Sequence, residues 1–153
     1  MQIRLTLSGN ASEVLRHTPA RLTRAGLLAA KRMAEDYTQA IHDYIDAGRS
    51  FVPRTGHLEQ SINWMPTATG AEVYAQSAYA GYVETGTRPH VIRPKPGRDA
   101  LRFPGRAGGF VIRRSVAHPG SLAMPYFFAD LDSRKQSLLA TARETFAEVL
   151  NGR

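Results

Sequence analysis

The sequence predicts an α+β fold: a small, mostly antiparallel sheet with a long N-terminal helix and a C-terminal helix packed on it, plus an extended basic β-ribbon. Two observations predict this fold. Apolar residues recur at helical spacing near both ends of the chain, and glycine and proline break the middle into short strand-like runs. The 153 residues suffice for one modest core. We therefore expect one domain over residues 1–153, with a protruding basic hairpin or loop over residues 86–120.

The N-terminal region predicts a strand and then a long helix. Residues 2–7 alternate polar and apolar, which is the period of a half-buried strand. Thr18 and Pro19 form a helix start, because a hydroxyl can cap the first turn and proline fits the first helical position. The helix should end near residue 46, with Gly48 as its C-terminal cap. Its apolar stripe is predicted to be core: Leu22, Ala29, Met33, Tyr37, Ile41, Tyr44 and Ile45.

The middle of the chain predicts short strands. Residues 62–65 and 72–77 have strand character and flank a glycine-containing turn, which indicates a hairpin. One helical turn is expected over residues 78–84. Further strands are expected at 90–93, 100–103 and 110–116, separated by turns rich in proline and glycine. Together they predict a long hairpin that reaches beyond its own globule.

The C-terminal region predicts a second helix over residues 126–150. An aromatic segment, residues 124–128, should pack against the sheet as this helix begins. Near-helical spacing is found for Phe128, Leu131, Leu138, Leu139, Ala142, Phe146 and Val149.

The excess positive charge lies in one segment. Residues 86–120 hold eight basic residues and one acid, Asp99, for a net charge of +7, which equals the net charge of the whole chain. Such a field suits a polyanion or an acidic protein surface, although a solvated ribbon without a partner has the same pattern. The candidate interface or DNA-channel residues are Arg88, Arg93, Lys95, Arg98, Arg102, Arg106, Arg113 and Arg114.

Several linked motifs add a family resemblance. Y-A-G-Y-V-E-T-G-T-R-P-H-V-I-R-P-K begins at Tyr79, A-L-R-F at Ala100, V-A-H-P-G-S-L-A-M-P-Y-F at Val116, and T-G-H-L-E-Q-S-I at Thr55. With the flanking helices they resemble, over about residues 20–150, the tailed-phage (siphophage) neck and tail-completion proteins, the "putative tail component" proteins of head–tail joining. The motif residues are Gly56, Leu58, Tyr79, Tyr82, Glu84, Gly86, Pro89, His90, His118, Pro119 and Gly120.

This resemblance implies a structural virion protein of a bacteriophage or prophage, and not an enzyme. It implies a homo-oligomeric ring, hexamer or dodecamer, that joins the head-closure complex to the tail. The expected partners are copies of the chain, the head-closure or adaptor proteins and the tail-terminator protein. The expected place is the head–tail junction of the virion, after assembly in the bacterial host cytoplasm. A tail-terminator ring of the same junction is the closest alternative.

The residues themselves offer no catalytic or cofactor site. The five histidines have no metal-binding spacing, and none of the serines lies in G-x-S-x-G. No phosphate-binding glycine motif is present, so no cofactor is expected. Glu84 is expected to be structural, as the ion-pair partner of an arginine such as Arg88. His90 and His118 are expected to make structural hydrogen bonds.

The remaining sequence features set the context. The chain has no cysteine, which fits assembly in a reducing compartment. No apolar run reaches the roughly 18 residues of a membrane span, and no signal peptide is visible, so no membrane partner is expected. Nonspecific DNA binding is the alternative from another class, because Phe103 and Phe110 interleave with the cations.

Overall fold

The computed structural model describes residues 1–6, 20–105 and 108–151, and the predicted α+β class is confirmed. Three strands, β1 (Gln2–Thr6), β2 (Ile62–Thr67) and β3 (Gly70–Ala75), form an antiparallel sheet in the order β1-β3-β2. Ile3 lies opposite Val73, and Trp64 pairs with Val73 from the other side. The β2–β3 hairpin was predicted from its turn residues, and β3 is the central strand.

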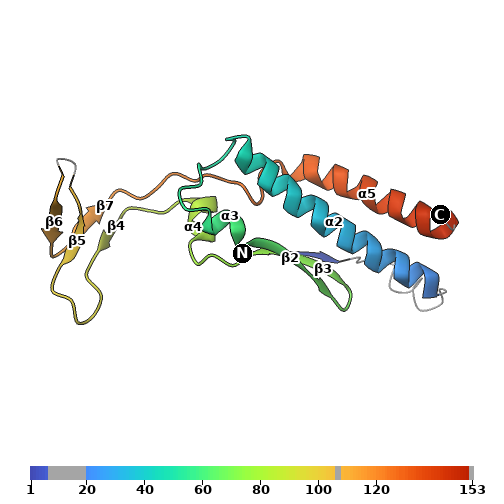
Figure 1. The fold of residues 1–153 in the computed structure, drawn as a ribbon, viewed down its shortest axis with the longest axis horizontal. Coiled ribbons are helices and arrows are strands. Elements are labelled where there is room, and N and C mark those ends of the chain that lie inside the picture. Colours follow the sequence, from blue (N-terminus) through green and yellow to red (C-terminus); the bar gives the residue numbers. More distant parts are fainter. Residues whose placement is uncertain (7–19, 106–107, 152–153) are drawn as a thin grey trace.

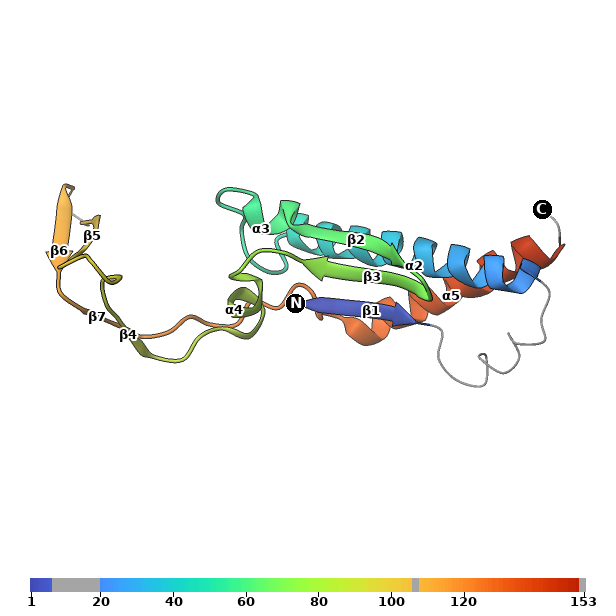
Figure 2. The same cartoon turned by 90° about the horizontal axis from the view of Figure 1, so that it is seen from below.

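Two long helices complete the body. Helix α2 (Ala20–Asp46) covers one face of the sheet, and α5 (Leu131–Asn151) runs antiparallel along α2 (Figures 1 and 2). Side chains link the two helices: Arg32 pairs with Glu148, and the hydroxyl of Thr141 donates to Asp36 at 2.6 Å. Among the described residues, no helix has the length and apolar character that a bilayer crossing requires.

The core lies between α2, the sheet and the segment that precedes α5. Much of the predicted α2 stripe is buried, including Tyr37, Ile41 and Ile45, whereas Leu22, Met33 and Tyr44 are half-buried. Small side chains such as Ala30 and Ala34 belong to the same core. Facing them are residues of the sheet, the pre-α5 segment and α5: Ile62, Ala71, Val73, Ala75, Tyr126, Phe127 and Leu138.

The end of α2 follows the prediction from Gly48. Gly48 has a φ of 68°, its N–H donates to the carbonyl of Ile45, and the N–H of Arg49 donates to the carbonyl of Tyr44. This is a Schellman ending, which satisfies two carbonyls that the helix leaves unpaired. The predicted helix start at Thr18 and Pro19, and the last predicted residue of the first strand, Leu7, lie outside the described residues.

Two predicted elements are corrected, and one further helical turn was not predicted. The C-terminal helix begins at Leu131 and not at residue 126, because Asp130 has a φ of 50°, outside the helical region, and the carbonyls of Tyr126 and Phe127 accept side-chain donors in place of helical amides. Phe128, Leu131 and Leu139 are exposed despite their spacing. The run 110–116 divides into two strands, β6 (Phe110–Arg113) and β7 (Val116–His118). Residues 57–60 form a helical turn, α3 (His57–Gln60), before the sheet begins.

Residues 87–121, called the arm here, extend away from the body (Figure 2). The arm leaves the body after α4 (Ala80–Thr85) and contains two successive antiparallel pairs. The pair nearer the body is β4 (His90–Ile92) with β7, and the outer hairpin is β5 (Leu101–Pro104) with β6. The arm therefore consists of two small ribbons in place of the one long hairpin predicted.

Candidate interaction surface

The arm is joined to the body at a narrow root. Thr87 and Ser121 form an isolated antiparallel bridge, with both backbone hydrogen bonds made, at 3.0 and 3.1 Å. Their hydroxyl groups also lie 3.0 Å apart, and the N–H of Ser121 donates to the Thr87 hydroxyl. Two motif segments 34 residues apart in sequence are thereby brought side by side.

Glycine is required at two positions of this root. A side chain at Gly86 would place a Cβ 2.5 Å from the carbonyl oxygen of Ser121, and one at Gly120 would overlap the carbonyl oxygen of Thr87. Both glycines also have positive φ, 71° and 89°, which other L-residues rarely adopt. The E-T-G-T-R and H-P-G motifs thus supply the two glycines that let the strands of the root approach.

Glu84 anchors the root to the pre-α5 segment. Its buried carboxylate accepts the backbone N–H groups of Tyr126, Phe127 and Phe128 at 2.9, 2.9 and 3.0 Å. The expectation of a structural role fits this geometry, but its partners are backbone amides and not an arginine such as Arg88. A carboxylate with three N–H donors is held firmly, since hydrogen bonds to a charged group are stronger than neutral ones.

Arg134 completes the anchor from the other side. This buried guanidinium donates through Nη1 to the carbonyls of Tyr126 and Phe127, both at 3.1 Å. The Tyr37 hydroxyl donates to the same Phe127 carbonyl at 2.6 Å. The amides and carbonyls of the pre-α5 segment are therefore held by side chains from α4, α2 and α5, which explains how it remains buried without being helical.

Burial also changes the acidity of two phenols in this anchor. Desolvation, reinforced by the negative charge of Glu84, raises the pKa of the Tyr126 phenol above its usual range. Desolvation likewise raises the pKa of Tyr37, although the adjacent positive charge of Arg134 opposes the shift. Both phenols are therefore neutral wherever the protein is folded near neutral pH.

The predicted histidines lie opposite each other at the base of the arm. His90 pairs with His118 across β4 and β7, and their ring centroids are 5.1 Å apart. Nδ1 of His90 hydrogen-bonds the carbonyl of Arg88, and Nδ1 of His118 accepts the N–H of Gly120. These are the structural hydrogen bonds expected of them, and Pro89 and Pro119 flank the pair.

The predicted cations are spread along the arm. Every one that the structure describes is exposed, and none of these has an acidic partner within ion-pair distance in the described chain. Arg106 lies outside the described residues. Arg102 lies over the ring of Phe110, 3.7 Å from its centroid. The cations are Arg88, Arg93, Lys95, Arg98, Arg102, Arg113 and Arg114.

Several apolar side chains on the arm are exposed to solvent. Phe110 and Ile112 are 61% and 62% exposed, and Val91 and Phe103 are exposed as well. A two-stranded ribbon has no second layer to cover such residues, and an isolated hairpin is marginally stable in water. Of these residues the sequence had drawn attention only to Phe103 and Phe110.

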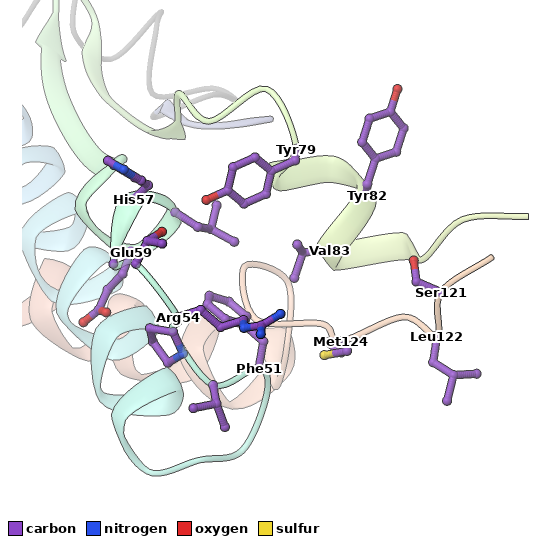
Figure 3. Close-up of a pocket in the computed structure, with 15 residues that line it drawn as sticks. Phe51, Arg54, His57, Glu59, Tyr79, Tyr82, Val83, Ser121, Leu122 and Met124 are labelled. Atoms are coloured by element: carbon purple, nitrogen blue, oxygen red, sulfur yellow. The ribbon is translucent and has the colours of Figure 1, made fainter. Parts of the chain in front are cut away.

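A groove lies in the body beside the root (Figure 3). Residues 51–59 form one side of it, and α4 with residues 121–124 forms the other, around a volume of about 530 Å³. Val52 and Leu122 on its border are 79% and 85% exposed, and Tyr79 and Tyr82 are also exposed. The motif residues Gly56 and Leu58 both line the groove, and Leu58 is buried and also belongs to the core.

Sequence reasoning missed most of this groove. The exposed positions of Val52, Leu122 and Met124 carry no local signal, because a single apolar residue in a loop is common on surfaces. Within the described residues, histidine, aspartate and glutamate form no group of three or more that could hold a metal ion. The arrangement is one of exposed apolar and cationic contacts, which suits binding of a macromolecule.

No protein-family model matches the chain, and neither the curated proteins nor the solved structures contain a significant match.

Proposed function

We propose that this chain is a structural virion protein of the bacteriophage head–tail junction, a neck or tail-completion protein that forms a ring and joins the head-closure complex to the tail. One observation carries the proposal. The motif residues behind the family resemblance, above all Glu84, Gly86 and Gly120, build the root of an exposed arm. Such residues serve to present a contact surface.

The partners of this role are the same as those that the resemblance implies. They are further copies of the chain in a hexamer or dodecamer, the head-closure or adaptor proteins on one side and the tail-terminator protein on the other. An arm that extends beyond its own body suits a ring, since it can reach a neighbouring subunit or an adjacent ring. Assembly in the host cytoplasm and a final place in the virion belong to the same proposal.

The experiment is a head–tail joining assay. Heads and tails from a phage lacking this protein are mixed with the purified chain, and joined particles are counted by electron microscopy and by infectivity. The proposal expects joining to be restored by the intact chain and not by a variant with residues 88–119 replaced by a short glycine-containing turn. Failure of the intact chain to restore joining would reject it. Labelling the chain in joined particles separates a neck position from a tail-terminator position.

Nonspecific DNA binding is the second candidate function. It is favoured by the exposed cations of the arm, which have no acidic partner in the described chain. Binding to duplex DNA should then fall about tenfold or more between roughly 50 and 200 mM salt, because each neutralised phosphate releases counterions. Replacing Arg113 and Arg114 by glutamine should reduce that salt slope. Absence of any DNA retardation at low salt would remove this candidate.

A further inference from the structure

Two apolar surfaces of this chain have no cover, and they lie at opposite ends of the arm. One is on the outer hairpin, β5 with β6, and the other is the groove beside the root (Figures 2 and 3). The extended arm holds them apart, so they cannot meet within one chain. Exposed apolar clusters of this kind generally mark contact sites on soluble proteins.

The outer hairpin presents one strongly exposed face. In the pairing of β5 with β6, Arg102 lies opposite Ile112, and Pro104 lies opposite Phe110. Because side chains alternate along a strand, these four residues share one face, called the tip face here. Phe103 and Val111 lie on the opposite face. Phe110 and Ile112 are the most exposed apolar residues of the arm, and the Arg102 guanidinium lies over the Phe110 ring.

The groove offers the matching chemistry. Its exposed side chains are mainly aliphatic and aromatic, among them Val52, Tyr82 and Leu122. Glu59 lines it, and exposed Asp46 ends α2 just before the segment that forms its wall. Neither acid has an ion-pair partner among the described residues. One cation, Arg54, also lines the groove, and the negative end of the α2 dipole lies at Asp46.

We propose that the tip face of one copy docks into the groove of a neighbouring copy, with Phe110 and Ile112 against Val52, Tyr82 and Leu122. Arg102, which shares the tip face, then lies near Glu59 and Asp46. The contact is heterologous, because different surfaces of the two copies meet, and repeating it generates a ring when the rotation closes. This contact would be the subunit interface of the ring in the proposed function. Only the closure of the multimer into a ring rests on that proposed function.

Apolar burial favours a second copy over DNA as the occupant. DNA phosphates could bind the cations of the arm, but they would not cover the apolar side chains of Phe110 and Ile112 on the tip face or those of the groove. A second copy covers both surfaces at once and places Arg102 beside carboxylates. An aromatic and an aliphatic anchor in a pocket, surrounded by charge, is the usual composition of an interface centre.

The first test uses the absence of cysteine from the chain. A double variant, Ile112→Cys with Leu122→Cys, is treated with a short bis-maleimide and analysed by denaturing electrophoresis. We expect a ladder of cross-linked multimers. Each single variant should give almost none, because two tip faces or two grooves do not meet. Dimers from Ile112→Cys alone would show contact between two tips, and absence of a ladder from the double variant would also overturn the proposal.

The second test is complementation between defective copies. Phe110→Thr with Ile112→Thr disables the tip face, and Val52→Ser with Leu122→Ser disables the groove. All four positions are exposed, so both variants should fold, which circular dichroism checks. Sedimentation should find wild-type multimers and a monomer for each variant, with self-association weakened at least about tenfold. An equimolar mixture should form a one-to-one pair, because one intact tip meets one intact groove.

The matched control is Val111→Thr, on the opposite face of the same strand, which should assemble like wild type. Wild-type protein that remains a monomer at its highest attainable concentration, or that gains mass only when duplex DNA is added, would overturn the proposal. The joining assay tests a separate claim. Rings with this interface that fail to join heads to tails would reject the proposed function alone, and joining by a chain with an intact tip but no self-association would reject the interface alone.

Discussion

The Glu84 carboxylate accepts the backbone N–H of Phe127 at 2.9 Å, across 43 residues of sequence. The same oxygen binds the N–H of Tyr126, and the other oxygen binds that of Phe128. These bonds join α4, the helix that precedes the arm, to the segment that follows the arm. They also satisfy the amides of the buried, non-helical segment that precedes α5.

Replacing Glu84 by glutamine should lower the free energy of unfolding by about 2 kcal/mol. Glutamine keeps the shape, but it has one carbonyl oxygen for three N–H donors, and its NH₂ group would face an amide. Urea unfolding followed by circular dichroism measures the change. Glu144→Gln, at an exposed position on α5, is the control and should change stability by less than about 0.5 kcal/mol. Equal stability of the two variants would contradict the anchor.

The two buried phenols should respond differently to loss of their hydroxyl groups. Tyr37→Phe removes the bond to the Phe127 carbonyl and should destabilise the protein by about 1 kcal/mol. The Tyr126 hydroxyl has no hydrogen-bond partner among the described residues, so Tyr126→Phe should be neutral or slightly stabilising. Thermal unfolding of both variants checks this, and a large loss for Tyr126→Phe would show that its hydroxyl is satisfied.

Stability should also fall at alkaline pH. Burial raises the pKa of Tyr126 above its value in the unfolded chain, so the neutral phenol contributes stability that is fully present below about pH 10 and is lost as pH rises further. Urea midpoints between about pH 8 and 11 measure this loss. Tyr126→Phe should lose less stability over the same range. An identical pH dependence in wild type and variant would refute the assignment.

Arg134 should contribute much more to stability than Lys135, its neighbour on α5. Arg134→Ala removes the donor of the Tyr126 carbonyl, leaves the Phe127 carbonyl with the Tyr37 hydroxyl alone and opens a space beside Tyr37, so we expect a loss of about 2 to 4 kcal/mol. Lys135→Ala, at an exposed position, should have almost no effect. The unfolding midpoints of the two variants are compared. Similar midpoints would contradict the stabilising role of Arg134 in the anchor.

The glycines of the root should tolerate no side chain. Gly120→Ala should cost at least about 1 to 3 kcal/mol, because its Cβ would overlap a backbone carbonyl and its φ is positive. Limited proteolysis should then cut near residues 86 and 121 faster than in wild type. Gly81→Ala on α4, where a Cβ meets open space and φ is ordinary, is the control. Unchanged proteolysis of Gly120→Ala would contradict the geometry of the root.

The sequence predicted those elements whose causes are local. Helix α2 ends where Gly48 adopts positive φ, and the β2–β3 hairpin turns at Ala68 and Thr69, directly before Gly70. The predicted start of α5 was wrong because side chains distant in sequence, Arg134 and Tyr37, donate to the carbonyls of the preceding segment in place of helical amides. Periodicity alone could not reveal these contacts, and the near-helical spacing that it found for Phe128 and Leu139 did not show that both are exposed.

In the candidate site, too, the sequence could reveal some features and not others. Charge counting located the cations of the arm, and the motifs located the residues of its root. The groove could not be predicted, because Phe51 and Leu122 come together only when both ends of the arm return to the body. The exposure of Phe110 was equally hidden, since strand-like apolar residues usually imply a covering layer that this ribbon lacks.

The Thr87–Ser121 bridge closes a loop of 34 residues, and loop-closure entropy grows only with the logarithm of length. Doubling or halving such a loop changes the folding free energy by only about 0.6 kcal/mol. The stability of the body therefore depends little on how many residues lie beyond the bridge. Insertions and deletions in the arm can therefore change how far it extends without destabilising the core. The length of the arm is limited by the distance to its binding partner and not by thermodynamic stability.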